Sequence, residues 1–216
     1  MMITKKLNKF SRGFVLILLA GFAFDSCKKE PLEFVIEGEI FDKSFGQLVD
    51  GGKVKLYKVL AATTQEVFIS DQNIVDGKYK FVFDRDRSEK YVIRFEKEFY
   101  FEEVLTVFFS QLQVGETYTV NFNAEAIAMM NWVFTDVAPV NSNGSASIQK
   151  LNGRSTGAGA CPNQEYEYFG GGVSDTLRCA VGGNQYIRFY VIDIPEFVLD
   201  SLYCSAFEDS FYQINF

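Results

Sequence analysis

Residues 76–83 read DGKYKFVF, and this stretch decides the class of fold. Tyr79, Phe81 and Phe83 alternate with two lysines, which is the two-residue period of a strand with one buried and one solvated face. The Asp-Gly pair in front of them is typical of a tight turn, because glycine adopts the left-handed backbone at no steric cost. The stretch therefore predicts a half-buried β-strand that begins directly after a turn.

The same alternation continues along the first half of the chain. Apolar and polar residues alternate over residues 34–40, 53–56, 91–95 and 117–122, and turn residues separate these segments at positions 50–52, 84–87 and 115. Residues 102–112 (EEVLTVFFSQL) have some helical character, but a buried strand followed by a loop accounts for them more simply. No sustained 3.6-residue period follows the N-terminal segment, so the chain is predicted to be all-β.

The second half contains seven further strand candidates. They are residues 132–137, 146–151, 165–169, 175–181, 185–194, 197–204 and 209–216. About seven short strands with a turn every 8 to 12 residues are typical of an immunoglobulin-like sandwich. We therefore predict two consecutive antiparallel β-sandwich domains, one over residues 34–123 and the other over residues 124–216.

Two family resemblances accompany this division. Residues 37–42 (EGEIFD), residues 51–57 (GGKVKLY) and the strand after Asp76-Gly77 resemble, in order and spacing, a transthyretin-like or carboxypeptidase-regulatory-like domain. Residues 176–181 (TLRCAV) and 185–190 (QYIRFY) are similar to the B and C strands of an immunoglobulin-like sandwich, without the tryptophan of the second strand. The resemblances imply a transthyretin-like domain followed by an immunoglobulin-like one.

The N-terminal 26 residues have the pattern of a secretory signal. Basic residues at positions 5, 6, 9 and 12 precede an apolar run at residues 14–24 (FVLILLAGFAF). A helix that spans a bilayer needs ~20 apolar residues, and this run is shorter. We therefore expect residues 1–26 to be removed on export.

The junction that follows resembles a bacterial lipoprotein signal. Ser26 directly precedes Cys27, and Lys28-Lys29-Glu30 follows, as in lipoproteins of Gram-negative gut anaerobes. The resemblance implies cleavage before Cys27, acylation of that cysteine, a tether over residues 27–33, and a lipid-anchored protein on the periplasmic or cell-surface face of the outer membrane. A plain signal peptide with an incidental Cys27 is the alternative.

The composition excludes several classes of function. The chain has no histidine, which removes Ser-His-Asp and Cys-His catalysis and histidine-containing zinc sites. Its formal charge of -7 argues against nucleic acid as a partner. Asp84, Asp86 and Glu89 alternate with basic residues, so a self-neutralised turn is favoured there over a calcium site. We predict no catalytic residue, no metal and no cofactor.

The aromatic residues are the main surplus, with 23 Phe and 11 Tyr beside a single Trp. Exposed tyrosine and tryptophan rings can stack on sugar faces, because they combine a flat apolar body with a polar tip. The strand phase or loop position leaves exposure open for Trp132, Tyr57, Tyr166 and Tyr168, which are therefore the ligand-binding candidates. Packing in a core is the default expectation for each of them.

Three cysteines remain once Cys27 is acylated. An exported protein meets an oxidising compartment, so one disulfide and one free thiol are expected. Cys179 is in phase with the inward residues of its strand and is predicted to be the buried thiol. Cys161 follows a run of small residues and Cys204 ends a strand, so these two are predicted to form the disulfide.

These features predict a non-enzymatic envelope lipoprotein that acts as a binding or accessory module for a glycan or a protein partner. The alternative is a structural, fimbrillin-like subunit that assembles by strand exchange, because transthyretin-like lipoproteins of these bacteria include such subunits. An enzyme with paired carboxylates is a third interpretation, which the small sandwiches disfavour because they rarely enclose a deep cleft.

Overall fold

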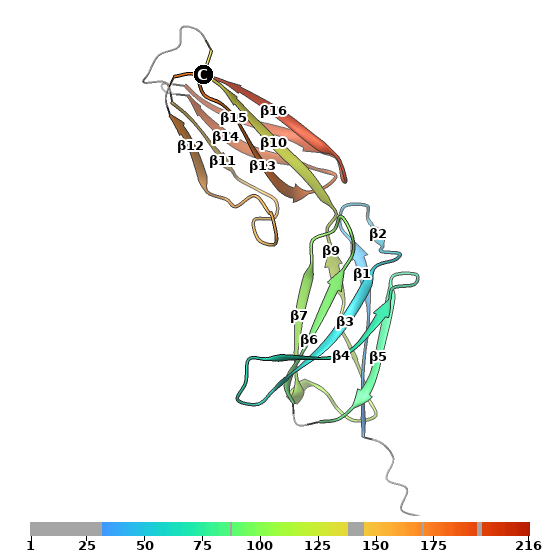
Figure 1. Ribbon diagram of the computed structural model, residues 1–216. Coiled ribbons are helices and arrows are strands. Elements are labelled where there is room, and N and C mark those ends of the chain that lie inside the picture. Colours follow the sequence, from blue (N-terminus) through green and yellow to red (C-terminus); the bar gives the residue numbers. More distant parts are fainter. Residues whose placement is uncertain (1–31, 87, 138–144, 170, 194–195) are drawn as a thin grey trace, which may run out of the picture. The chain divides into compact units, whose positions relative to one another are not determined.

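The computed structural model describes residues 32–86, 88–137, 145–169, 171–193 and 196–216 (Figure 1). These residues form an all-β protein, as the alternation predicted, with a single short 3₁₀ helix, η1 (Phe109–Gln111). Within them, no helix is long and apolar enough to cross a bilayer. The signal sequence and Cys27 lie outside the described residues, so the lipid anchor stays a prediction from the sequence.

The first sandwich consists of two sheets. One sheet contains the strands β1 (Glu33–Asp42), β2 (Gln47–Leu48), β5 (Lys78–Asp84), β8 (Thr117–Thr119) and β9 (Phe122–Ala124). The other sheet has the order β4 (Glu66–Asn73), β3 (Lys53–Leu60), β6 (Ser88–Glu96) and β7 (Glu103–Phe108). Residues 102–112 accordingly form an edge strand and the 3₁₀ turn rather than a helix.

Strand β1 lies at the centre of its sheet. It pairs antiparallel with β5 on one side, where Ile36 lies opposite Phe81, and parallel with β8 and β9 on the other. The chain therefore fills this position with its own first strand. A donor strand from another subunit could take this central position only after displacing β1.

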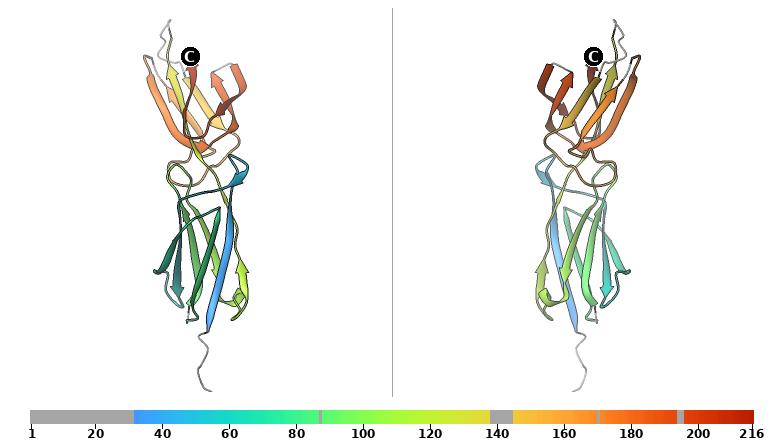
Figure 2. Two further views of the ribbon diagram at one scale, coloured as in Figure 1. Left: turned by 90° about the vertical axis from the view of Figure 1, so that its right-hand side faces the viewer. Right: turned by 90° about the vertical axis from the view of Figure 1, so that its left-hand side faces the viewer.

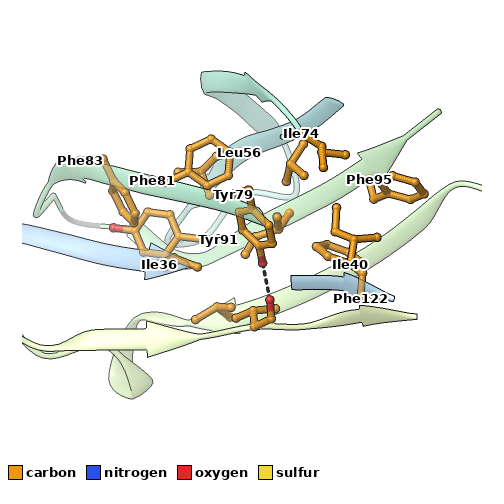
Figure 3. Close-up of a cluster of buried hydrophobic side chains, with 14 of the residues drawn as sticks. Ile36, Ile40, Leu56, Ile74, Tyr79, Phe81, Phe83, Tyr91, Phe95 and Phe122 are labelled. Atoms are coloured by element: carbon orange, nitrogen blue, oxygen red, sulfur yellow. Dashed lines mark hydrogen bonds between the residues drawn. The ribbon is translucent and has the colours of Figure 1, made fainter. Parts of the chain in front are cut away.

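The first hydrophobic core is rich in aromatic rings (Figure 3). Tyr79, Phe81 and Phe83 all point into it from β5, which confirms the inward phase predicted for this strand. The ring of Phe83 lies 4.9 Å from that of Tyr91, and that of Phe81 lies 5.8 Å from that of Tyr79. Contacts of this kind stabilise a core beyond the burial of area alone.

The second sandwich also consists of two sheets, and Figure 2 shows the strand layers from two sides. One sheet has the order β13 (Ser174–Gly182), β10 (Ile127–Thr135) and β16 (Asp209–Asn215). The other has the order β12 (Glu165–Phe169), β11 (Ser145–Lys150), β14 (Gln185–Asp193) and β15 (Glu196–Cys204). Each of the seven strands overlaps one predicted from the sequence.

The disulfide in the second core differs from the predicted one. Cys161 pairs with Cys179, with their Cα atoms 5.1 Å apart, whereas Cys204 is a buried free thiol. The segment before Cys161 does not form a free loop as expected, because Ala180 on β13 donates to the carbonyl of Gly159 at 2.7 Å and accepts from the amide of Cys161 at 2.8 Å. This pairing holds Cys161 beside the neighbouring Cys179. The predicted disulfide between Cys161 and Cys204 was therefore wrong.

Candidate functional site

Trp132 does not form part of an exposed platform. Its side chain is fully buried in the second core, where its ring lies edge-on to Phe189 at 6.1 Å. Trp132 points inward because it lies on the same face of β10 as Met130 and Phe134, which are also buried. The expectation that Trp132 contributes to ligand binding is therefore corrected.

Tyr166 and Tyr168 also face inward. Both lie on β12 and pack half-buried against the second core. The ring of Tyr168 stacks on Phe134 with centroids 3.9 Å apart, and burial raises the pKa of both phenols. These two tyrosines fill the edge of the core and present no flat face to solvent.

Tyr57 is the one candidate that faces outward. It lies half-buried on β3, with its ring 5.6 Å from that of Phe68 and with the Arg94 guanidinium 5.8 Å from its centroid. Arg94 in turn pairs with Glu66 at 2.9 Å. The Tyr57 ring is thus already in contact with side chains of the protein itself. The four candidates of the sequence analysis do not come together in one site.

A different group of aromatic residues does come together, on the outer face of β14 and β15. We call this surface the aromatic face. Its residues form four cross-strand pairs, which in order along β14 are Tyr186 with Tyr203, Arg188 with Ser201, Tyr190 with Leu199, and Ile192 with Phe197.

Four apolar members of the aromatic face are exposed, whereas Tyr190 and Ile192 are half-buried. Tyr186 is 63% exposed, Phe197 60% and Leu199 58%. The rings of Tyr186 and Tyr203 meet edge-on at 5.1 Å, and those of Tyr190 and Phe197 lie 4.5 Å apart. Side chains that contact one another while remaining exposed form a preassembled surface, which marks an interaction site more strongly than scattered apolar residues do.

Polar groups cross the middle of the aromatic face. Arg188 and Ser201 are both exposed and lie opposite each other, between the Tyr186 and Tyr190 pairs. Within the described residues, the Arg188 guanidinium makes no ion pair. The face therefore offers hydrogen-bond donors between two apolar rows.

The backbone beneath this polar row is held by Asn152. Its side-chain oxygen accepts from the amide of Arg188 at 2.6 Å, and its side-chain nitrogen donates to the carbonyl of Tyr186 at 2.9 Å. These two bonds continue the ladder of β14 where β11 has ended at Lys150. The positions of Tyr186 and Arg188 are thereby fixed before any ligand arrives.

Asn152 itself lies in a turn that a buried lysine organises. Lys150 is only 1% exposed, and its Nζ donates to the carbonyls of Asn152, Gly153 and Arg154 at 3.0, 3.3 and 2.8 Å. Burial lowers the pKa of Lys150, and the three carbonyl acceptors satisfy its donors. Lys150 thus supports the aromatic face from below through the turn that carries Asn152.

The opposite sheet of the same sandwich has an ordinary outer face. Thr176, Arg178 and Gln213 point outward from it, and Arg178 pairs with Asp209 at 3.1 Å. Phe211 is the exposed aromatic residue there, at 65%. The sheet that contains β14 and β15 thus exposes more aromatic residues than the opposite one, since Tyr186, Tyr203 and Phe197 are exposed on these two strands and Phe169, at 69%, on β12.

A groove of about 580 Å³ lies on the first sandwich, over β1, β5 and β8. Its charged lining groups already pair with each other, since Lys80 lies 3.0 Å from Glu37 and Lys78 lies 3.7 Å from Glu39. The lining is therefore neutralised internally. The groove is a weaker candidate than the aromatic face.

The sequence contained a signal for the aromatic face. A half-buried strand should alternate apolar and polar residues. In β14 the inward positions are the buried Ile187, Phe189 and Val191, but two of the outward positions, which should be polar, are Tyr186 and Tyr190. Apolar residues on both faces of a strand in an exposed sheet are an anomaly that points to an interaction surface, and the exposure of single rings does not reveal it.

Comparisons with known proteins identify no family for this all-β, two-core chain. No family model and no curated protein matches it. Among solved structures, it resembles the Bacillus anthracis TIE protein at 12% identity and a TM-score of 0.38, covering 85% of this chain and 34% of that one. It thus spans about a third of that protein's length.

Two further solved structures are similar over most of their length. A shaft pilin, SpaA from Lactobacillus rhamnosus GG, has 11% identity and a TM-score of 0.32, with 86% of this chain and 97% of the pilin covered. A DUF3823 family protein from Bacteroides uniformis has 11% identity and a TM-score of 0.29, with 79% and 99% covered. At such TM-scores, none of these likenesses assigns a function to this chain.

Proposed function

We propose that this protein is a non-enzymatic, lipid-anchored envelope protein that binds a glycan through the aromatic face. The observation that supports the proposal is the assembly of the exposed Tyr186 and Tyr203 and the half-buried Tyr190 around a polar row. Sugar rings have apolar C–H faces and hydroxyl edges. Tyrosine rings can stack on the former, while Arg188 and Ser201 can bind the latter.

The shape of the site favours binding over catalysis. The residues of the aromatic face lie along two neighbouring strands and project from a sheet surface. Such a surface leaves a ligand open to water, whereas catalytic carboxylates need an enclosed site in which their pKa values can be set apart. An extended glycan chain, which lies across several side chains at once, suits this surface better than a small substrate.

The anchor follows from the sequence around Cys27. Strand β1 begins at Glu33, so the residues between an acylated Cys27 and the sheet would span at most ~20 Å. This tether would hold the first sandwich close to the outer membrane. A binding protein in that position would retain glycans at the envelope for other proteins to use.

Strand exchange is the competing proposal, in which the chain would be a fimbrillin-like subunit. It requires an open position in a sheet, yet β1 already pairs with β5 on one side and with β8 and β9 on the other. Proteolytic removal of β1 would be needed to open that position. The complete pairing of β1 therefore favours a binding module over a strand acceptor.

The proposal is tested by binding of the detergent-solubilised full-length protein to an array of plant, host and bacterial oligosaccharides. We expect defined glycans to bind, and the double variant Tyr186→Ala/Tyr190→Ala to weaken binding at least about ten-fold. Phe211→Ala, which removes an exposed ring from the opposite sheet, is the matched control. Absence of glycan binding, or equal loss in the control, would contradict the proposal.

A further inference from the structure

We infer that the aromatic face selects acidic glycans, with Arg188 binding a carboxylate or sulfate group on the sugar chain. This inference rests on the proposed function and specifies the class of ligand. It depends on where Arg188 lies, on the absence of a carboxylate partner for it in the described residues, and on how its backbone is fixed.

Arg188 lies where a bound chain has to pass. Residues on one face of a strand repeat every ~7 Å, so Arg188 lies that distance from both Tyr186 and Tyr190. A glycan that stacks on both tyrosines extends over ~14 Å along β14 and crosses the guanidinium between them. The charge is thus central to the site rather than at its rim.

The guanidinium is also available to a ligand. Arg94, Arg154 and Arg178 each form an ion pair with a carboxylate of the protein. Arg188 has no such pair among the described residues, although acidic residues outnumber basic ones by 28 to 21 in the chain. A planar guanidinium binds carboxylate and sulfate oxygens through two parallel hydrogen bonds, which gives it both charge and geometric complementarity to such groups.

The surrounding residues also set the direction of the bound chain. Glu165 and Glu167 are exposed on β12, two strands away from β14, and Ser147 on the intervening β11 donates to Glu165 at 2.5 Å. Their negative charge disfavours an anionic chain that runs across β11 and β12. An acidic glycan is therefore directed along β14 and β15, over Arg188.

The backbone that carries Arg188 is held in place by a neighbouring turn. Asn152 bonds to the backbone of both Tyr186 and Arg188, so the stacking residue and the cation keep a constant separation. Binding then costs little ordering of the protein, apart from the arginine side chain itself.

The inference is tested with matched ligands and the full-length protein in detergent. Oligogalacturonate is compared with its neutral methyl ester, and a sulfated galactan oligosaccharide with its unsulfated form. We expect the acidic member of at least one pair to bind about ten-fold more tightly at low salt, and this preference to shrink as salt rises. The pair that shows the preference identifies carboxylate or sulfate as the recognised group.

Variants separate this inference from the proposed function. Arg188→Gln should remove the preference, so that the acidic and neutral members of the pair bind with equal affinity, and Arg188→Lys should retain part of the preference because the charge remains. Arg178→Gln makes the same charge change on the opposite sheet and should leave the preference intact. Equal affinities for acidic and neutral members, with binding still lost in Tyr186→Ala/Tyr190→Ala, would overturn the inference but not the proposed function. Failure of every ligand to bind would overturn both.

Discussion

The phenol of Tyr79 donates a hydrogen bond to the carbonyl oxygen of Val120 at 2.6 Å, across the first core (Figure 3). The same oxygen lies against Gly38 on β1, where a Cβ atom would be only 1.7 Å away from it. The connection between β8 and β9 therefore approaches the middle of β1 so closely that only glycine fits. The close approach in turn places the Val120 carbonyl within reach of Tyr79.

Gly38→Ala is expected to lower the free energy of unfolding by ~3 kcal/mol, since the obstacle is a backbone atom that cannot rotate away. Gly46→Ala is the control. It lies in an open turn with a φ of 68° and no atom near its would-be Cβ, so only left-handed strain of ~1 kcal/mol is expected. Urea unfolding measures both values. Similar losses in the two variants would show that the Gly38 contact is not tight.

Alkaline pH should destabilise the protein through its buried tyrosines. Burial raises the pKa of Tyr91 from 10.0 to about 12. Below pH 10 the phenol is neutral in both states, whereas between pH 10 and 12 only the unfolded chain releases the proton, so the free energy of unfolding falls. Tyr91→Phe should reduce this fall, and Tyr186→Phe on the exposed face should not. Urea midpoints at pH 8 and 11 test the prediction, and parallel curves for all three proteins would refute it.

The disulfide should contribute measurably to stability. Cys161 and Cys179 are separated by 18 residues in sequence, for which the chain-entropy model gives about 3 kcal/mol. We expect the double variant Cys161→Ser/Cys179→Ser to lose that amount. Peptide mapping without reductant should recover these two cysteines linked, and Cys204 should react with a thiol reagent only after unfolding, because burial raises the pKa of its thiol. A linked peptide that contains Cys204 would disprove the pairing.

Replacing the anchor residue should change where the protein resides. Cys27→Ala is expected to give an uncleaved precursor or a released protein, because acylation requires the cysteine thiol. Metabolic labelling with a radioactive fatty acid, followed by membrane fractionation, measures the change. Cys204→Ala serves as the control for loss of a thiol, and equal lipid labelling in Cys27→Ala and wild type would exclude the anchor.

Local alternation predicted most strands, but it missed the two-residue β2 and the longer β4. Strand β12 was predicted with the bounds observed, since its tyrosines alternate with glutamates between turns. Strand β4 was not predicted, because Phe68 and Ile69 stand next to each other and the strand is half exposed along its length. Pairing with β3 forms this edge strand, and a pairing partner cannot be recognised from period alone.

The candidate site depended on information that alternation does not carry. The phase of β10 could have placed Trp132 inside, since Met130 and Phe134 share its side of the strand. The pairing of Cys161, in contrast, depends on a segment that lies beside β13 through tertiary hydrogen bonds. The aromatic face likewise depends on the register between β14 and β15, which brings Tyr203 opposite Tyr186 from the far end of a hairpin.

The central position of β1 has a mechanical consequence. A tethered protein that holds a polymer transmits tension, which would enter the first sandwich at Glu33 and leave it at Ala124. These residues lie at opposite ends of parallel neighbours, since β1 starts at Glu33 while Ala124 ends β9 opposite Asp42. A pull between them shears β1 along β8 and β9, so the hydrogen bonds across the strands are strained together instead of opening one after another. The first sandwich is thus arranged to resist stretching between Glu33 and Ala124.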